Sequence, residues 1–230
     1  YDALEIEEAP DWYNFHPFGD LSKDSAGRAQ KYKEESVRKE NQQDFGEDNF
    51  EDFLVSCGLR IELRSATPAE LPRVAELLQR TNQMNATLQR SDLADIRSKY
   101  NSDSGSVHIA KLGDKFGDYG LIGVIISELN NGVLNIQELA FSCRAMGRRV
   151  EHALIEEIIG HGYDNKIGKV SINVTKTSRN HQIIKTLDEE GFVEEEVDGD
   201  LVTMSTQIKD RKGRELPHWF TLDKDIGGDE

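Results

Sequence analysis

The sequence VLNIQELAFSCRAMGRRVEHALIEEII occupies residues 133–159 and carries two hydrophobic patterns in succession. Residues 133–141 have the composition of a buried strand. The helical period then appears in apolar residues four positions apart: Met146, Val150, Leu154 and Ile158. We therefore predict a strand that passes through a short polar junction, Ser142–Glu151, into a helix.

Strand and helix patterns alternate on both sides of this junction. The turn Asn130-Asn131-Gly132 favours a hairpin between two of the strands. The order from residue 59 onward reads β-α-α-β-β-β-α-β-α-β-β, which predicts a mixed α/β sheet flanked by helices. The strands are expected at 59–64, 106–112, 121–129, 133–141, 168–175, 192–197 and 201–208, and the helices at 22–43, 49–57, 68–80, 91–100, 146–159 and 178–190.

The formal net charge of −15 lies entirely in the flanks of the chain. Residues 1–58 carry −9 and residues 193–230 carry −6, whereas residues 59–192 are neutral. The chain lacks an overall basic field, so we expect neither a nucleic acid nor an anionic membrane as partner. The longest apolar run, Leu121–Ile126, is too short to span a bilayer, and two cysteines make no disulfide framework, so we expect a cytoplasmic protein.

Three arginines crowd the predicted start of the helix after Phe141. A helix N-terminus already presents positive charge and free N–H groups, so the added cations favour a bound anion such as phosphate or pyrophosphate. The alternative is that the arginines turn sideways to form salt bridges with Glu151 or Glu138. The three arginines are Arg144, Arg148 and Arg149.

The pattern Arg144-x-x-Gly147-x-Arg149 between a strand and a helix resembles the acyl-CoA pyrophosphate loop of GNAT-type acyltransferases. The segment 177–180, followed by the Gly-Phe pair after Glu190, is similar to that family's second cofactor contact, with Asn180 opening the helix. The resemblance implies a GNAT-like fold, a mixed and mostly antiparallel sheet, with CoA or phosphopantetheine bound by Arg144, Gly147, Arg148, Arg149 and Asn180. The family usually has a small residue where this chain has Arg149.

Three separated segments, 81–87, 114–120 and 142–144, look more specifically like the C-terminal half of FkbH-like proteins. Those proteins join a HAD-type phosphatase domain to a GNAT-like domain and are implicated in loading a glyceryl unit from 1,3-bisphosphoglycerate onto an acyl carrier protein. This resemblance implies that residues 1–58 are a helical extension trailing a HAD domain that this chain lacks. Residues 59–208 would then be the acyltransferase domain and residues 209–230 an acidic tail.

Cys143 stands beside the arginines at the predicted helix start, an environment that favours the thiolate. A thiolate attacks acyl phosphates and thioesters, and the FkbH-like resemblance makes Cys143 a suspected acyl-carrying nucleophile. The alternative is a small side chain buried at a strand end. His152 is a candidate general base, and Asp118 is expected to orient a base or a substrate hydroxyl.

Amide side chains follow the first predicted helix of the domain and suit a glyceryl or pantetheine group, because each amide both donates and accepts. Turn formation explains the same residues almost as well. No Cys/His spacing supports zinc, so we expect no metal. With the motif residues included, the expected substrate-binding set is Asn82, Gln83, Asn85, Phe116 and Arg179.

Three functions therefore remain open. The first is transfer of a glyceryl-type acyl group to the phosphopantetheine thiol of an acyl carrier protein. The second is N-acetyl transfer from acetyl-CoA to an amine. The third is a non-catalytic module that docks a carrier protein through the neutral middle of the chain.

Overall fold

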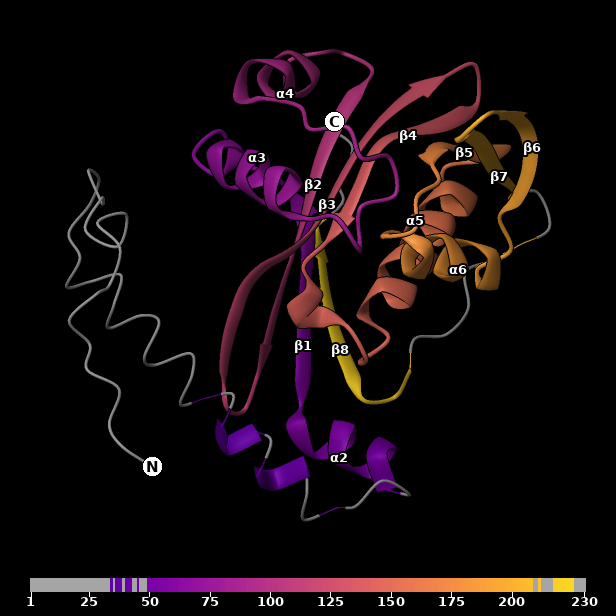
Figure 1. Ribbon diagram of the computed structural model, residues 1–230. Coiled ribbons are helices and arrows are strands. Elements are labelled where there is room, and N and C mark those ends of the chain that lie inside the picture. Colours follow the sequence, from indigo (N-terminus) through magenta and orange to yellow (C-terminus); the bar gives the residue numbers. More distant parts are fainter. Residues whose placement is uncertain are drawn as a thin grey trace, which may run out of the picture.

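The strand patterns assemble into one eight-stranded sheet, with helices on both of its faces (Figure 1). This computed structural model describes residues 34, 36–38, 40–42, 45, 49–208, 211 and 217–225. The strands are β1 (Leu59–Ser65), β2 (Gly105–Asp114), β3 (Gly117–Asn130), β4 (Val133–Phe141), β5 (Lys169–Thr175), β6 (Val193–Asp198), β7 (Leu201–Gln207) and β8 (Phe220–Asp225). The helices are α2 (Phe50–Cys57), α3 (Leu71–Arg80), α4 (Leu93–Tyr100), α5 (Val150–Asp164) and α6 (His181–Glu189).

The sheet has the order β6-β7-β5-β4-β3-β2-β1-β8. Only β4 with β5 and β1 with β8 pair in parallel, so the prediction of a mixed, mostly antiparallel sheet is confirmed. Residues 34, 36–38 and 40–42 are helical, as expected for the N-terminal extension. The remainder of the helix predicted over 22–43 lies outside the described residues.

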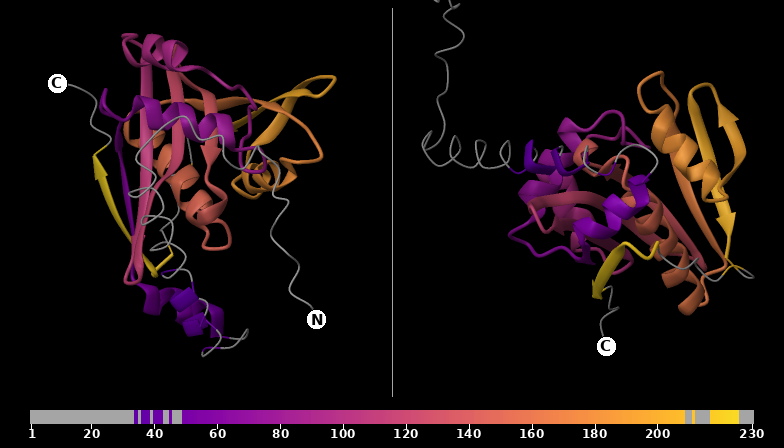
Figure 2. Two further views of the ribbon diagram at one scale, coloured as in Figure 1. Left: turned by 60° about the vertical axis from the view of Figure 1, so that its left-hand side comes forward. Right: turned by 90° about the horizontal axis from the view of Figure 1, so that it is seen from below.

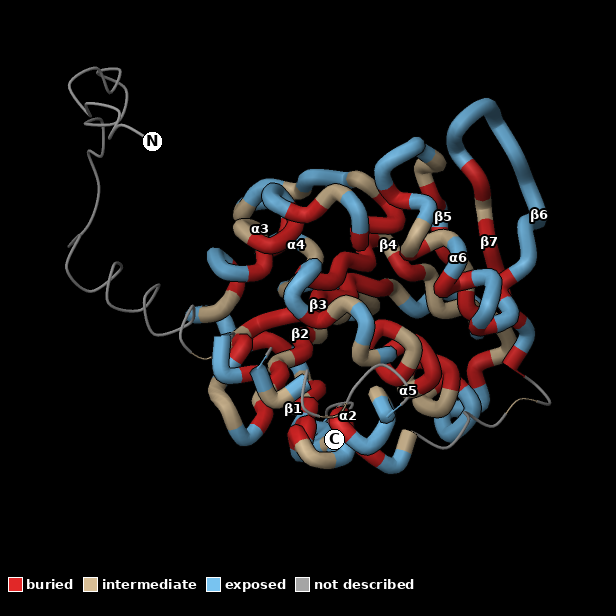
Figure 3. Tube along the Cα trace, turned by 60° about the horizontal axis from the view of Figure 1, so that its bottom comes forward, coloured by how far each residue is buried: buried red, intermediate tan, exposed pale blue. Residues whose placement is uncertain are grey.

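Two hydrophobic cores lie on opposite faces of the sheet (Figure 2). One joins α3 and α4 to the sheet through Val74, Leu78 and Ile96, all fully buried. The other packs α5 and α6 on the opposite face. The central strands are buried and β6 is exposed along its whole length (Figure 3). No helix in the described part of the chain combines the length and apolar character that a membrane span requires.

The predicted hairpin forms where the sequence reads Asn-Asn-Gly. Asn131 and Gly132 have φ values of 52° and 75°, and they connect β3 directly to β4. Two successive left-handed residues give a turn whose twist matches that of paired strands, and Asn and Gly tolerate this conformation best.

Several elements differ from the sequence prediction, three of them in ways that bear on the site or the sheet. Helix α5 begins at Val150 rather than Met146, because Cys143–Ala145 form a separate 3₁₀ turn, η3. Helix α3 begins at Leu71, so the proline of its first turn is Pro72 and not Pro68. Strand β8 falls in the segment expected to be a tail, and its apolar residues are limited to Phe220 and Leu222.

A β-bulge bends β4 away from β5. Opposite Ile126 and Ser127 on β3, the partners on β4 are Glu138 and Ile136, which leaves Gln137 as the extra residue. The pairing of β4 with β5 also ends at Ile136, although both strands continue. The two parallel strands therefore diverge over their last residues, next to the junction that carries the arginines.

Acidification is expected to weaken the fold through His108 on β2. Burial, and then the nearby charge of His161, lower the pKa of His108 to about 4. An unfolded histidine binds its proton near pH 6.5, so the unfolded chain takes up more protons between these values. We expect about 3 kcal/mol of stability to be present above pH 6.5 and lost as the pH falls to 4.

The measurement is urea unfolding at a series of pH values for the native chain and for His108→Gln. Glutamine cannot titrate, so its curve should be flatter between pH 6.5 and 4. Parallel curves for the two proteins would mean that His108 does not carry the effect.

Candidate functional site

The junction between β4 and α5 is held by hydrogen bonds between its own residues. The Ser142 hydroxyl accepts hydrogen bonds from the main-chain N–H of Arg144, at 3.4 Å, and from its Nε, at 3.2 Å. Gly147 and Arg149 both have positive φ values, 78° and 61°. Glycine adopts this region freely, whereas Arg149 does so with a Cβ atom and hence with strain. We call residues 142–149 the arginine loop.

The three arginines of this loop have no acidic partner among the described residues. Arg148 donates to the main-chain oxygens of Arg144 and Met146, at 3.1 and 3.2 Å, and Arg144 and Arg149 are exposed. The salt bridges considered as the alternative do not form here, since Glu138 pairs with Lys99 at 2.8 Å. The loop therefore presents positive charge at the start of α5.

Glu151 lies buried in the first turn of α5, only 5% exposed. Burial raises the pKa of its carboxyl, against the weaker opposing effects of its own main-chain N–H and of His152 and Arg149. Its Oε2 atom has no hydrogen-bond partner. A carboxyl in this state is shifted toward its neutral form and offsets less of the charge of the arginine loop.

The two cysteines lie in opposite environments. Cys143 is exposed, and its Sγ atom lies 3.9 Å from Oε1 of Gln83. Cys57 is buried in the core, where burial raises the pKa of its thiol. The structure therefore places Cys143 at the surface rather than in the buried position considered as its alternative. It also brings together two predicted site residues that are 60 positions apart.

The segment Met84–Thr87, which we call the bridging segment, lies between the diverging ends of β4 and β5. On one side the Ala86 N–H donates to the Leu139 oxygen at 3.0 Å, and the Phe141 N–H donates to the Met84 oxygen at 2.8 Å. On the other side the Thr175 N–H donates to the Ala86 oxygen at 3.1 Å. The gap between the strands is thus filled by the chain itself.

Asn180 fixes the bridging segment to the start of α6. Its Nδ2 atom donates to the main-chain oxygens of Asn85, at 3.1 Å, and of Thr175, at 2.9 Å. Its Oδ1 atom accepts from the N–H and hydroxyl of Thr177, both at 2.9 Å. Asn180 and Asn85 are fully buried, so these two predicted binding residues meet inside the protein.

The remaining predicted residues make contacts of their own that do not include Cys143. Asn82 accepts a hydrogen bond from Arg90, and Arg179 is exposed. Asp118 is exposed and accepts from the Gly120 N–H at 2.7 Å. The ring of His152 is held elsewhere, with Nδ1 2.7 Å from Oε1 of Glu190, whereas Phe116 packs at the tip of the β2–β3 hairpin.

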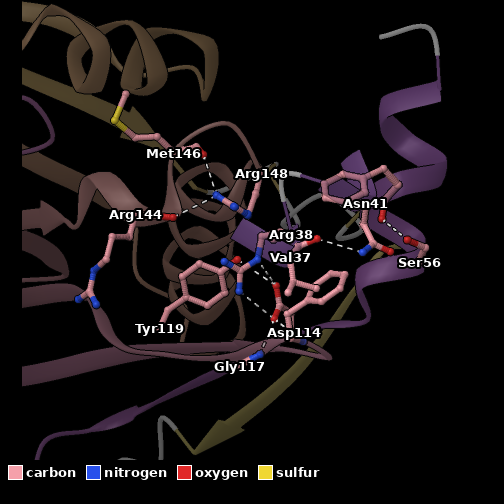
Figure 4. A network of polar contacts seen from close by, with 12 residues as sticks. Val37, Arg38, Asn41, Ser56, Asp114, Gly117, Tyr119, Arg144, Met146 and Arg148 are labelled. Atoms are coloured by element: carbon pink, nitrogen blue, oxygen red, sulfur yellow. Dashed lines mark hydrogen bonds and ion pairs between the residues drawn. The ribbon is translucent and has the colours of Figure 1, made fainter. Parts of the chain in front are cut away.

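An anchor that sequence patterns did not reveal joins the N-terminal extension to this site (Figure 4). Arg38 binds both carboxylate oxygens of Asp114, at 2.8 and 3.1 Å, and the Tyr119 hydroxyl donates to the same carboxylate. Arg38 and Arg148 lie over the Tyr119 ring, with their guanidinium carbons 4.4 and 5.2 Å from its centroid. The extension therefore contacts the arginine loop through one aromatic ring.

Burial alone would raise the pKa of Asp114. The hydrogen bonds from Arg38, the Phe116 N–H and Tyr119 outweigh it and hold that pKa below its usual value. Burial also raises the pKa of the Tyr119 hydroxyl, which therefore remains a hydrogen-bond donor.

Several solved structures with similar folds are N-acetyltransferases. The ribosomal-protein-S18-alanine N-acetyltransferase of Escherichia coli matches 64% of this chain and 94% of its own, at a TM-score of 0.51 and 14% identity. A domain from Methanocaldococcus jannaschii matches 65% of this chain and 99% of its own, at a TM-score of 0.52 and 12% identity. Spermidine N-acetyltransferase of Vibrio cholerae, in complex with CoA and spermine, matches 64% of this chain and 95% of its own, at a TM-score of 0.49 and 17% identity.

These matches give the chain a GNAT-like fold, as the sequence predicted. No protein-family model matches the sequence, and no curated protein matches it either. The fold resemblance therefore defines the class of architecture, and the chemistry has to be argued from the site.

The arginine loop and the edge of β4 offer different groups to a ligand such as acyl-CoA. The arginine loop suits the phosphates, because its guanidinium groups have no carboxylate partner among the described residues. The arm, which is a chain of amides, needs main-chain donors and acceptors beside the loop. At the nearest strand edge, the Leu139 oxygen and the Phe141 N–H are already bonded to the bridging segment.

Proposed function

We propose that the chain is an acyltransferase in which Cys143 carries the acyl group. Arg144, Arg148 and Arg149 hold a phosphorylated acyl donor, and the phosphopantetheine thiol of an acyl carrier protein receives the acyl group. The observation that supports this most directly is an exposed thiol at the head of a loop whose three arginines lack acidic partners in the described part of the chain.

The first step loads the enzyme. Cys143 loses its proton to solvent, and its thiolate attacks the carbonyl carbon of the acyl phosphate. A carbon–sulfur bond forms, the bond from that carbon to the phosphate oxygen breaks, and inorganic phosphate leaves. The arginines stabilise the charge that gathers on this leaving phosphate.

The second step transfers the acyl group. The thiolate of the acceptor attacks the same carbon, and the bond to the Cys143 sulfur breaks, so the enzyme thiolate is restored. Gln83 is placed to hold the acyl group, because its side-chain oxygen lies 3.9 Å from Sγ. The proposal keeps Asn82, Phe116 and Arg179 as substrate contacts, Asp118 as an orienting group and His152 as a base.

A glyceryl unit is the acyl group that we favour. The resemblance of residues 81–87, 114–120 and 142–144 to FkbH-like proteins supports 1,3-bisphosphoglycerate as the donor and a HAD-type phosphatase domain as partner. Carrier proteins are usually acidic, so we place the docking surface at the arginine loop and away from the acidic flanks. We propose the cytoplasm as the location.

A second candidate is N-acyl transfer from acyl-CoA to an amine. The GNAT-like fold favours it, and so does a cavity of about 500 Å³ beside the paired stretch of β4 and β5. Its lining includes Glu128, Gln137 and Asn173, which would suit an amine. This function requires the bridging segment to move, because the arm of CoA otherwise has no strand edge to bind.

One experiment separates these functions. The protein is supplied with 1,3-bisphosphoglycerate or acetyl-CoA as donor, and with a holo acyl carrier protein or spermidine as acceptor. Thioester formation from the acyl phosphate supports the first function, and amide formation from acetyl-CoA supports the second. If the carrier protein binds and neither product forms, the chain acts as the non-catalytic docking module that the sequence also allows.

Arg149 gives a prediction in which stability and binding change in opposite directions. Arg149→Gly and Arg149→Ala both remove the cation, so each should weaken binding of inorganic phosphate about tenfold. Glycine alone relieves the positive φ, so Arg149→Gly should be about 0.5–1 kcal/mol more stable than Arg149→Ala. Calorimetric titration and urea unfolding measure the two effects. If both variants bind phosphate as tightly as the native chain, Arg149 does not contribute to the phosphate site.

A further inference from the structure

We infer that the bridging segment replaces the arm of acyl-CoA at the edge of β4, so that the chain takes its acyl group from donors held by their phosphates alone. This inference rests on the proposed function and specifies its donor class. Acyl phosphates are accepted, and acyl-CoA thioesters are excluded from the gap between β4 and β5.

The edge of β4 is the place where an amide chain would bind. An extended chain of amides is recognised by pairing with a free strand edge. The last residues of β4 lead directly into the arginine loop, so a ligand with phosphates on the loop would lay its arm along this edge. Both of the edge groups nearest the loop, the Leu139 oxygen and the Phe141 N–H, are already paired.

The bridging segment is built into the core rather than laid over it. Met84, Asn85 and Ala86 are fully buried, and Met84 and Ala86 belong to the core that contains α5. The clamp by Asn180 adds hydrogen bonds to main-chain oxygens from inside the protein. Lifting the segment would leave several buried polar groups unpaired, and each costs about 1–3 kcal/mol.

The same segment also shapes the space around the thiol. Gln83 immediately precedes Met84, and its side chain contacts Cys143. Moving the segment out of the gap would therefore also move Gln83 away from the nucleophile. A closed gap and a complete thiol site occur together, which favours a donor that approaches from the exposed side of the loop.

Hydrogen exchange tests the inference without any catalytic assay. The amides of Ala86, Phe141 and Thr175 should exchange at least about a thousandfold more slowly than in an unfolded chain. These amides should not exchange faster when CoA is added at about 5 mM. Rapid exchange in the free protein, or faster exchange after CoA is added, would overturn the inference.

Binding by an opened variant gives the complementary test. Ala86→Pro removes the N–H that bonds to Leu139, and Ala86→Gly keeps it as the matched control. The native chain and Ala86→Gly should bind CoA and 3′-phospho-ADP, which lacks the arm, within about threefold of each other. Ala86→Pro should prefer CoA by about tenfold.

A tenfold preference for CoA in the native chain would overturn the inference, and so would the lack of any preference in Ala86→Pro. If neither ligand binds to the native chain, the phosphate site of the proposed function fails, and the exchange rates still decide whether the gap is closed. The proposed function itself depends on acylation of Cys143, which neither measurement requires.

Discussion

Replacing Cys143 by alanine is expected to lower acyl transfer from an acyl phosphate to a carrier thiol by at least about a thousandfold. The thiol is exposed, it lies at the head of the arginine loop, and its sulfur forms both of the bonds in the proposed reaction. The fold should be unaffected, because an exposed side chain contributes little to the core. The measurement is the rate of thioester formation on the carrier protein under saturating donor.

Cys57→Ala is the matched control for this variant. Cys57 is the other cysteine of the chain and is buried in the core, so its loss should reduce stability while leaving transfer close to the native rate. If the Cys143→Ala variant keeps more than a tenth of the native transfer rate, the acyl group passes directly from donor to acceptor.

Replacing Asp114 by alanine is expected to destabilise the protein by about 3–5 kcal/mol. The side chains of Arg38 and Asp114 are 5% and 0% exposed, so the variant removes two hydrogen bonds from a buried guanidinium. The carboxylate also accepts from the Phe116 N–H and the Tyr119 hydroxyl, and both donors would lose their acceptor. Urea unfolding followed by circular dichroism gives the change in the free energy of unfolding.

Asp118→Ala provides the comparison within the same hairpin. Asp118 is exposed and accepts one main-chain hydrogen bond, so its loss should cost no more than about 1 kcal/mol. Equal losses for the two variants would show that the contact between Arg38 and Asp114 contributes nothing beyond the turn. Asp114→Ala should also weaken phosphate binding, since Tyr119 links Arg38 to Arg148.

Elements with a clear local period were predictable from the sequence. The strand over 133–141 is confirmed at both ends, because its apolar pattern stops where the polar loop begins. The turn at Asn131 and Gly132 is confirmed for a similar reason, since its residues select one backbone conformation. Strand β8 was missed because its Thr, Asp and Lys residues are exposed and its place depends on pairing with β1.

The candidate site was predictable only in its continuous part. The arginine loop lies in one stretch of sequence, so its composition could be interpreted directly. The contact between Gln83 and Cys143 and the pairing of Arg38 with Asp114 join residues 60 and 76 positions apart, and no local pattern carries that information. The bridging segment reads as an ordinary connection until its hydrogen bonds to two strands are known.

Intact-mass spectrometry of the protein after brief exposure to 1,3-bisphosphoglycerate tests the central claim most directly. We predict a mass gain equal to one phosphoglyceryl group, located on Cys143 by peptide analysis and removed by a holo carrier protein. An unmodified protein under conditions where product forms, or an adduct that persists in Cys143→Ala, would contradict an acyl group carried on this thiol.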